Sequence, residues 1–484
     1  MSFLRNLFAM AVISAVVAAP DLAASAQQIA LDAPDRALAR EIFQQLIETN
    51  TSHSVGSTTV AAEAMRKRLL DAGFDAKDVV VMGSDARHGN LIARYRGAPG
   101  STKKPMLIIC HLDVVEANRE DWTTDPFQLV EKDGYFYGRG TQDIKESDAA
   151  SIVSFLRLKR EGFVPDRDIV LALTAGEEGG EGNGVEWLLK SHRELIGAEF
   201  ALNADAGGLS TQQAKPICIN VEATEKYYAD FQLIATNPGG HSSHPTRDNA
   251  IYHVTDALGK IEQYTFPFEL NDVTRAYFLA MSKVLQGQQA EDMAAITRPA
   301  PSIDAEARLA IDPLYNATMR TTCVATMMQA GHAPNALPQQ AQANVNCRIL
   351  PGHTPAEIRS MLKTVIADPK IDVRLVDNTG ALSDKDENEM SITPPPLNKE
   401  VFAALQDVAG KMWPGLPIIP DMETGASDST LTMQAGIPTY GFSGMGIDED
   451  DDRAHGKDER IRAEAFYTGV QFDYMYLKRL TGSK

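Results

Sequence analysis

The sequence predicts an α/β fold: a mostly parallel sheet covered by helices, with a smaller α+β domain inserted into it. Up to about residue 214, apolar strands alternate with amphipathic helices, a pattern typical of a parallel sheet. Beyond that point the strands alternate apolar and polar residues, as in a sheet with one face in water. The length of 484 residues also exceeds what one ordinary core buries. We therefore expect a larger domain from residues 27–214 and 386–484 and a smaller one from residues 215–385.

Apolar residues at helical or alternating spacing predict the individual elements. The larger domain should contain helices over 38–47 and 60–72, strands over 90–95 and 106–110, a helix over 144–159, a strand over 168–174, a helix over 399–412, a strand near 436–442 and a helix over 463–480. The smaller domain should contain strands over 217–222 and 227–235, helices over 250–262 and 274–285, strands over 321–328 and 342–350, a helix over 355–366 and a strand over 371–376. The polar, proline-rich stretch 378–396 is the predicted return linker.

Residues 1–26 have the features of a secretory signal peptide. Arg5 is positively charged, residues 7–19 are apolar, and Ala24-Ser-Ala26 offers a small-residue cleavage site. The apolar run is short for a membrane span, and no cysteine that could carry a lipid anchor precedes Cys110. We expect a mature protein that begins at Gln27, does not bind membranes and is secreted, into the periplasm if the source is a Gram-negative bacterium.

The composition excludes several classes of protein. With 44% apolar and 23% charged residues, the chain is typical of a folded globular protein. A net charge of −19 argues against nucleic-acid binding, which requires a basic surface. The densest acidic run, residues 448–452, is interpreted as a solvated loop. Four cysteines are too few for a disulfide scaffold, and none has the spacing of a zinc knuckle or a redox motif.

The most informative stretch is an apolar strand that ends in His111, with Asp113 two residues later. A histidine at the carboxyl end of a buried strand lies at the mouth of the sheet, where α/β proteins bind their ligands. The Asp113 carboxylate can orient the imidazole, and metal-bound histidines usually have such a partner. Alone the motif is weak, because most histidines at strand ends are structural.

Four further motifs supply the other ligands of a two-metal site. They are Gly138-Arg-Gly-Thr-Gln-Asp143, Ala175-Gly-Glu-Glu178, Asn203-Ala-Asp205 and Ala454-His455-Gly456. Catalytic zinc sites take histidine nitrogens and carboxylate oxygens and keep one position open for water. Two ions about 4 Å apart require a bridging carboxylate. Asp143 is the candidate bridge, because the glycines before it allow the backbone to approach closely.

The adjacent residues Glu177 and Glu178 suggest two different roles. Neighbouring glutamates usually lie on a solvated surface, but these follow the apolar strand 169–175 and lie between Gly176 and Gly179. Because adjacent side chains point in different directions, Glu178 can bind a metal while Glu177 faces the water as a general base.

With these motifs the chain resembles the co-catalytic di-zinc metallopeptidases, the family of carboxypeptidase S, carnosinase, aminoacylase, acetylornithine deacetylase and succinyl-diaminopimelate desuccinylase. Residues 122–127 and 137–143 are most similar to the carboxypeptidase S-like branch. The resemblance implies a zinc-exopeptidase catalytic domain in which Asp113 orients a ligand and Glu177 is the general base. The ligand sets that it implies are His111, Asp143 and Asp205 for one Zn²⁺ and Asp143, Glu178 and His455 for the other. The family often has Asp-Asp-Lys-Gly where this chain has Asp143-Ile-Lys-Glu146, but the metal ligand is retained.

The resemblance also implies that the smaller domain is a lid that forms a homodimer. His241 matches the histidine that reaches into the partner's active site to stabilise the oxyanion. Asn335 and Arg348 match lid residues that hold the substrate, and arginine suits a carboxylate because its planar fork binds both oxygens. Gly425 lies in a loop that lines the pocket, and residues 263–315 form a large lid insertion.

The predicted function is that of a secreted metallohydrolase that cleaves an amide bond beside a free carboxylate, in a small peptide or an N-acyl amino acid. It would use two Zn²⁺ per subunit, although Co²⁺ or Mn²⁺ can fill such sites. Two alternatives remain: an N-acyl-amino-acid deacylase or amidohydrolase, and a metal-binding homologue that has lost catalysis. Glu177 argues against the second, because a decayed homologue is expected to lose its base.

Cys323 and Cys347 lie on two strands that we expect to be antiparallel neighbours, each twelve residues from Asn335. This symmetric placement can bring the two cysteines opposite one another, within reach of a disulfide. An exported protein can keep such a bond, but two buried free thiols are the favoured interpretation. Cys110 is interpreted as a small buried apolar residue.

Overall fold

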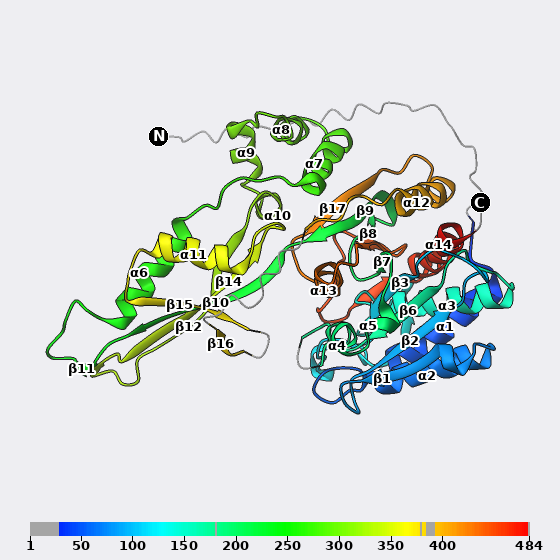
Figure 1. Ribbon diagram of the computed structural model, residues 1–484, viewed down its shortest axis with the longest axis horizontal. Helices are drawn as coiled ribbons and strands as arrows, with labels where there is room; N and C mark the ends of the chain where they lie inside the picture. Colours follow the sequence, from blue (N-terminus) through cyan, green and yellow to red (C-terminus); the bar gives the residue numbers. More distant parts are fainter. Residues whose placement is uncertain (1–28, 180–181, 378–379, 384–392, 483–484) are drawn as a thin grey trace, which may run out of the picture.

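The computed structural model describes residues 29–179, 182–377, 380–383 and 393–482. One domain is built on a ten-stranded sheet and the other on a five-stranded antiparallel sheet (Figure 1). The predicted signal peptide, residues 1–26, lies outside the described residues. Among the described helices, none has both the length and the apolar character needed to cross a membrane.

The large sheet confirms the expected α/β fold with a mostly parallel sheet. Its central neighbours β6, β3, β7 and β18 run parallel to one another. In spatial order the strands are β1 (Val79–Gly83), β2 (Gly89–Tyr95), β6 (Ile169–Thr174), β3 (Met106–His111), β7 (Ala201–Asn203), β18 (Thr439–Gly441), β9 (Lys215–Glu225), β8 (Gly208–Gln212) and β19 (Gly446–Asp448), and β17 (Ile418–Glu423) also pairs with β9.

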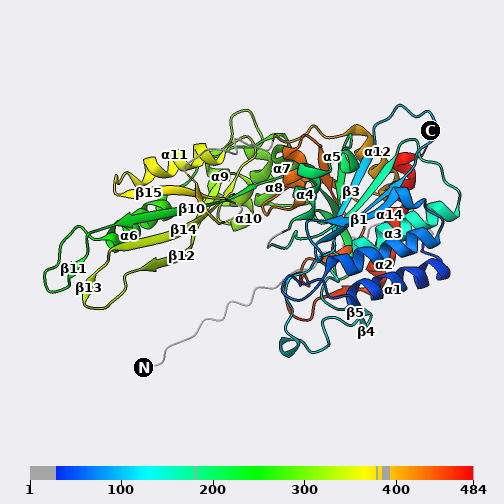
Figure 2. The same ribbon diagram turned by 60° about the horizontal axis from the view of Figure 1, so that its bottom comes forward.

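Both faces of this sheet are buried, which explains the continuous apolar character of its central strands. Along β3, Met106, Ile108 and Cys110 pack in one core, whereas Leu107 and Ile109 pack in a second core on the opposite face. Figure 2 shows α1, α2 and α3 together on one side of the sheet. The helices of the first core are α1 (Ala33–Glu48), α2 (Thr58–Asp71), α3 (Lys145–Arg160), α12 (Lys399–Met412) and α14 (Ala463–Thr481), and those of the second are α4 (Gly184–Ser191), α5 (Arg193–Ile196) and α13 (Asp428–Gln434).

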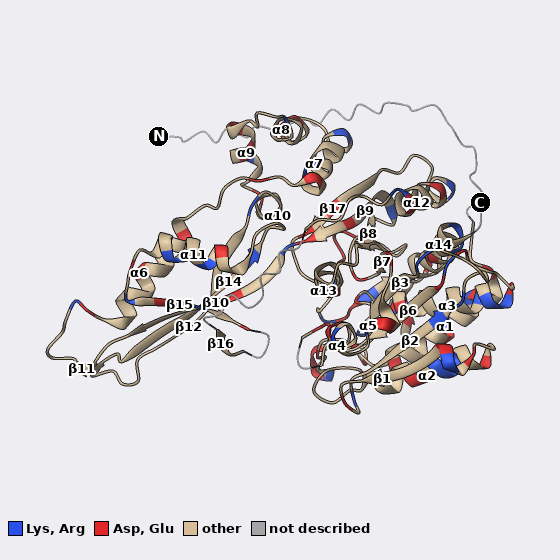
Figure 3. Cartoon of the chain, in the orientation of Figure 1, with Lys and Arg blue, Asp and Glu red and all other residues tan. Residues whose placement is uncertain are grey.

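Smaller elements complete the large domain. They are a three-stranded sheet of β4 (Val130–Lys132), β5 (Tyr135–Tyr137) and β20 (Arg460–Arg462), and two short 3-10 helices, Ala76–Asp78 and Arg119–Asp121. Acidic and basic residues are interspersed along α2, whereas the basic residues near the end of α3 gather in its last turn (Figure 3). The acidic run 448–452 is not simply a solvated loop: Asp448 pairs with Arg462, and Asp451 pairs with Arg460.

The five-stranded sheet and its two helices, which we call the lid, have one covered and one open face. Val345 and Cys347 of the central strand β14 pack beneath the helices, so Asn346 and Arg348 lie on the open face. At the end of the lid farthest from the large domain, two short strands pair (Figure 1). The lid elements are β12 (Thr322–Ala330), β14 (Gln340–Ile349), β10 (Tyr227–Thr236), β15 (Ile371–Val376), β16 (Leu382–Ser383), α6 (Ala250–Gln263) and α11 (Pro355–Ile366), with β11 (Gly240–His241) and β13 (Ala336–Leu337) at the far end.

The structure moves the start of the lid from residue 215 to Tyr227. The stretch that begins at 215 is β9, which pairs with β8 and β17 of the large sheet, and the lid sheet begins with β10. The alternation over residues 217–222 suggested one solvated face, but helices from the insertion cover that face. The other predicted boundary, at 386, lies outside the described residues.

The helices of the insertion pack on the large sheet, whereas Phe266, which precedes them, packs in the core of the lid. Tyr277 and Phe278 share a core with Cys218 of β9 and Ile419 of β17. The insertion therefore covers the part of the large sheet from which the chain passes into the lid. Its helices are α7 (Asp272–Val284), α8 (Gln288–Ile296), α9 (Ile303–Leu309) and α10 (Pro313–Thr318).

Cys323 of β12 and Cys347 of β14 form a disulfide. The two residues lie directly opposite one another in the antiparallel register, with Cα atoms 4.1 Å apart. The symmetric placement around Asn335 is thus confirmed, and the favoured interpretation of two free thiols is wrong. Cys110 and Cys218 are buried and unpaired.

Removal of this disulfide is expected to destabilise the lid by about 3 kcal/mol, because the bond closes a loop between residues 24 apart in the sequence. The double variant Cys323→Ala/Cys347→Ala should therefore unfold at a lower urea concentration than the wild type. Reducing agent should lower the midpoint of the wild type and leave that of the double variant unchanged. A wild-type midpoint that does not respond to reduction would contradict the prediction.

Candidate active site

Three neighbouring strands of the large sheet end at the candidate site. His111 is the last residue of β3, Glu177 and Glu178 follow β6, and Asp205 follows β7. Because β6, β3 and β7 are adjacent and parallel, their carboxyl ends meet at one edge of the sheet. The fold thus brings together side chains that are far apart in the sequence.

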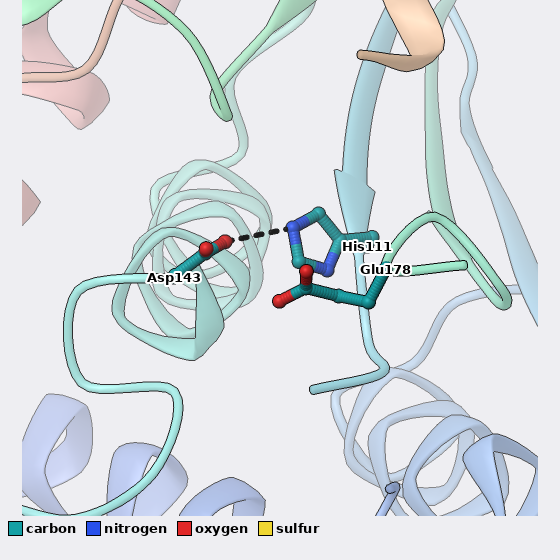
Figure 4. A group of neighbouring side chains, drawn as sticks. All are labelled: His111, Asp143 and Glu178. Carbon is teal, nitrogen blue, oxygen red and sulfur yellow. Dashed lines mark hydrogen bonds and ion pairs between the residues drawn. The ribbon is translucent and has the colours of Figure 1, made fainter. Parts of the chain in front are cut away.

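His111 is buried among the carboxylates of this edge. Its Nε2 lies 3.0 Å from Oδ1 of Asp143 and 3.5 Å from Oδ1 of Asp205. Figure 4 shows Asp143 facing one nitrogen of the ring, with the carboxylate of Glu178 next to the ring. On the other side of the ring, Nδ1 lies 3.0 Å from the backbone carbonyl oxygen of Asp113. If Nδ1 donates to that carbonyl, the lone pair of Nε2 faces the carboxylates, which is the tautomer that a metal ligand requires.

Asp113 acts on a different partner from the one that the sequence suggested. Its carboxylate lies 3.9 Å from Nδ1 of His111, so its carbonyl and not its side chain contacts the imidazole. The carboxylate instead accepts the backbone N–H groups of Glu177, at 3.2 Å, and Glu178, at 3.0 Å. Gly176 makes this turn possible, because its φ is +71° and a Cβ there would lie 2.9 Å from the backbone of Asn183.

Asp143 lies between two histidines. Its Oδ1 faces His111, and its Oδ2 lies 2.9 Å from Nε2 of His455. The same His455 nitrogen lies 2.8 Å from Oε2 of Glu178. His455 comes from the loop between β19 and β20. The two oxygens of one carboxylate therefore point toward two separate groups of side chains.

The ionisation of these groups reflects the crowding of carboxylates in a buried place. Burial raises the pKa of Glu178 to about 7 and, together with Asp205, raises the pKa of Glu177 to about 10. The hydrogen bond to Asp143 raises the pKa of His455 to about 9. Burial works to raise the pKa of Asp143, but hydrogen bonds from both histidines outweigh it and hold that pKa below its usual range.

The donor atoms fit divalent metal ions. Ligand atoms of His111, Asp143 and Glu178 lie within 4.8 Å of one another, and so do those of His111, Glu177 and Asp205. Oε1 of Glu178 is buried and has no hydrogen-bond partner among the described residues. Cations here would give that oxygen a partner and offset the repulsion between the carboxylates. Glu177, the predicted base, thus also lies among the donor atoms beside His111.

The predicted substrate residues of the lid divide into two groups. Arg348 lies on the open face of β14, with its guanidinium 4.7 Å from the centre of the Tyr228 ring. His241 and Asn335 lie together at the far end of the lid, where the N–H of Ser242 donates to the Asn335 carbonyl at 3.0 Å. Figures 1 and 2 place this end of the lid far from β3 and β6 of the same chain. The chain therefore does not bring His241 to its own site.

Gly425 lies in the loop between β17 and α13, near Ser427 and Ser429, whose contacts with Asn203 were not predicted from the sequence. Asn203 donates from Nδ2 to the hydroxyls of Ser427, at 3.0 Å, and Ser429, at 2.9 Å. Oδ1 of Asn203 also accepts the backbone N–H of Asp205 at 3.1 Å. Asn203 thus ties the predicted ligand to this loop. Its place at the end of β7, two residues before Asp205, was the signal available in the sequence.

A comparison with known protein families shows to which family the chain belongs. A family model described as "Peptidase family M20/M25/M40" matches residues 107–479. The chain belongs to this family. The matched range includes the whole candidate centre, from His111 to His455. As an M20 protein, the chain is a hydrolase that acts on peptide or amide bonds.

The chain is similar to M20 relatives that are named as N-fatty-acyl-amino acid synthase/hydrolases and to one that is named as a carboxypeptidase S-like protein. N-fatty-acyl-amino acid synthase/hydrolase PM20D1 of Xenopus tropicalis is 28% identical over 375 residues, which cover 76% of this chain and 71% of the relative. Probable carboxypeptidase S-like 2 of Dictyostelium discoideum is 29% identical over 404 residues, which cover 80% of this chain and 74% of the relative.

Solved M20 structures confirm the fold. The M20 family metallo-carboxypeptidase Sso-CP2 from Sulfolobus solfataricus gives a TM-score of 0.65 at 16% identity and covers 91% of this chain and 99% of its own. The YXEP protein of Bacillus subtilis, described as a dinuclear metal binding peptidase, gives a TM-score of 0.58 at 11% identity. The match covers 93% of this chain and 100% of the YXEP chain.

Proposed function

We propose that this M20 protein is a secreted zinc-dependent hydrolase that cleaves an amide bond beside a free carboxylate. The observation that carries the proposal is the position of Asp143, whose two oxygens face different histidines, His111 and His455. A carboxylate that lies between two such groups has the arrangement of a bridging ligand of two metal ions. The proposed export, to the periplasm in a Gram-negative source, rests on residues 1–26 alone.

Each proposed metal ion would be held by side chains that lie within reach of one another. The assigned sets are His111, Asp143 and Asp205 for one ion and Asp143, Glu178 and His455 for the other. Zinc in these places would supply a Lewis acid that acidifies water and polarises the amide carbonyl. Co²⁺ and Mn²⁺ also bind nitrogen and carboxylate donors of this kind.

Glu177 is the proposed general base. It would take the proton of the attacking water and deliver it to the leaving amine. Its orientation is supported by Asp113, which fixes the backbone of Glu177 and of the proposed ligand Glu178 in one turn. Base and ligand are therefore held by the same carboxylate, so their relative position is set before substrate binds.

The lid would provide the remaining groups. Among the described residues no acidic side chain forms an ion pair with Arg348, so its guanidinium is available to a substrate carboxylate. His241 and Asn335 lie far from the site of their own chain (Figure 1). We therefore place them in the site of a partner subunit, in a homodimer formed through the lids.

Both peptides with a free carboxyl end and N-acyl amino acids suit this centre. The names of the relatives include a carboxypeptidase S-like protein and an N-fatty-acyl-amino acid synthase/hydrolase, so the second substrate type is the main alternative. A homologue that binds metal without catalysis has less support, because Glu177 is retained beside the donor atoms.

The test is an assay of the purified protein with dipeptides and with N-acyl amino acids that share the same carboxyl-terminal residue. At least one series should be hydrolysed, with activity lost to a chelator and regained with Zn²⁺. If protein that carries two metal ions hydrolyses neither series, the metal-binding alternative replaces the proposed activity.

Arg348→Ala is expected to reduce kcat/KM about 100-fold for substrates with a free α-carboxylate, because a charge-assisted contact contributes about 3 kcal/mol. Amidated analogues of the same substrates should lose far less. The matched control is Arg374→Ala, which removes an arginine of β15 that pairs with Asp372. Equal losses on acid and amide substrates would show that Arg348 does not bind the carboxylate.

A further inference from the structure

The loops that carry Asp143 and His455 meet over a buried ion pair. Arg139 lies four residues before Asp143, and Glu459 lies four residues after His455. Nη1 of Arg139 donates to Oε2 of Glu459 at 2.5 Å, and the two side chains are 3% and 0% exposed. Neither residue touches the donor atoms of the candidate centre, and the proposed mechanism uses neither.

Glu459 holds the backbone beside Asp143. Its Oε1 accepts the N–H of Gln142 at 2.7 Å, one residue before Asp143, and its carbonyl oxygen accepts the N–H of Gly138 at 3.1 Å. The Gln142 side chain adds a second tie between the same loops, because its Oε1 accepts the N–H of Arg453 at 2.6 Å. The backbone that leads to Asp143 is thus hydrogen-bonded to the segment that contains His455.

Arg139 holds the backbone at His455. Its Nη2 donates to the carbonyl oxygens of His455, at 3.3 Å, and Gly456, at 3.0 Å. His455 has a φ of +61°, a left-handed conformation that costs energy in a residue with a side chain and persists only where the surroundings hold it. The guanidinium also lies 5.1 Å from the centre of the Trp122 ring, so its plane is supported from one side.

A buried ion pair of this kind is better explained by the positioning of neighbouring residues than by a contribution to the stability of the fold. Removal of two charges from water costs about as much as their attraction returns, so buried ion pairs are often replaceable by apolar residues without loss of stability. Here each member bonds to the backbone next to one of two residues that must converge on the same ion. The contacts therefore fix the separation and orientation of Asp143 and His455.

We propose that Arg139 and Glu459 are positioning residues that set the affinity of the metal ion shared by Asp143, Glu178 and His455. The proposal rests on the ligand sets of the proposed function. The ion at His111 and Asp205 shares Asp143 with it, but its other two ligands come from β3 and the end of β7, which the pair does not contact, so its affinity should change less. The pair thus acts mainly on the metal position that includes His455.

The test is calorimetric titration of the metal-free protein with Zn²⁺, together with the visible spectrum of the Co²⁺-loaded protein. In Glu459→Gln, one of the two affinities should fall about 10- to 100-fold, the range seen when the partner of a metal ligand is removed. The Co²⁺ absorption of one ion should shift with it. Saturating metal should restore kcat while KM stays unchanged, which a general loss of folding would not produce. Arg139→Lys, which keeps the charge and loses the fork, should show the same selectivity and guards against misfolding of the first variant.

The matched control is the pair of Arg157 and Asp35, far from the site, which joins α3 to α1. Nε of Arg157 lies 2.8 Å from Oδ2 of Asp35, and the two side chains are 9% and 1% exposed. The guanidinium of Arg157 lies 3.6 Å from the centre of the Tyr474 ring. Arg157→Lys should lower the melting temperature and leave both metal affinities unchanged. If Glu459→Gln and Arg139→Lys behave in the same way, the positioning role is overturned. If the wild type itself binds fewer than two ions, the ligand assignment of the proposed function fails as well.

Discussion

Glu177→Gln is expected to abolish turnover while both metal ions stay bound. The amide keeps the shape of the carboxylate but cannot accept the proton of the attacking water, and loss of a general base costs about 10²- to 10⁴-fold in rate. The backbone N–H of Glu177 would still bond to Asp113, so the loop should keep its conformation. Measurement of kcat and of metal content on the same preparation tests both parts of the prediction.

Metal content is the decisive measurement, because an oxygen of Glu177 lies among the donor atoms of His111 and Asp205. A variant that loses an ion would make Glu177 a ligand and would leave the role of base to another residue. Glu178→Gln is the matched control: it makes the same change one residue later, and its N–H bonds to the same carboxylate at 3.0 Å. That control should lower the metal content.

A mixture of inactive Glu177→Gln protein and inactive His241→Ala protein is expected to recover about a quarter of wild-type activity if the lids form a twofold dimer. In a mixed dimer, one site combines an intact Glu177 with the partner's intact His241. With random exchange about half of the dimers are mixed, and each has one complete site of two. Recovery is expected because β11, which contains His241, lies at the end of the lid farthest from the large domain of its own chain (Figure 1).

Subunit exchange must be shown independently, for example with two affinity tags. His244→Ala is the matched control, because it removes a second exposed histidine from the same turn, three residues from His241. It should leave activity unchanged. Absence of recovery despite proven exchange would mean that His241 acts in its own subunit or has no role in catalysis.

Local sequence signals were sufficient to predict an element that has its own start signal and its own buried face. The helix predicted over 355–366 has those bounds in the structure, because Pro355 can begin a helix and Thr354 caps it together with Glu357. The site at the carboxyl ends of β3 and β6 was also predictable, since both motifs follow a predicted apolar strand directly, whereas the short strand β7 beside Asp205 was not among the predicted strands.

Long-range partners were not predictable from local pattern. Arg139 and Glu459 are 320 residues apart, and no local spacing links them. Asp113 has the expected position, but its carboxylate binds the turn after β6, and this contact depends on how two strands are placed beside one another. The solvated face expected for residues 217–222 is covered because the insertion folds back on β9, a tertiary contact that the alternation does not encode.

The order in which the chain is made has a consequence for the assembly of the centre. His111, Asp143, Glu178 and Asp205 all precede the lid in the sequence, whereas His455 follows it. In the part of the chain that the structure describes, the lid strands pair only with one another, so the lid can fold as soon as it emerges. The first half of the large domain must wait for β17, β18 and α14 to complete its sheet and core. With His455 as a proposed ligand, a chain that stops before it is expected to show no activity, because the proposed metal centre is completed only in the last stage of synthesis.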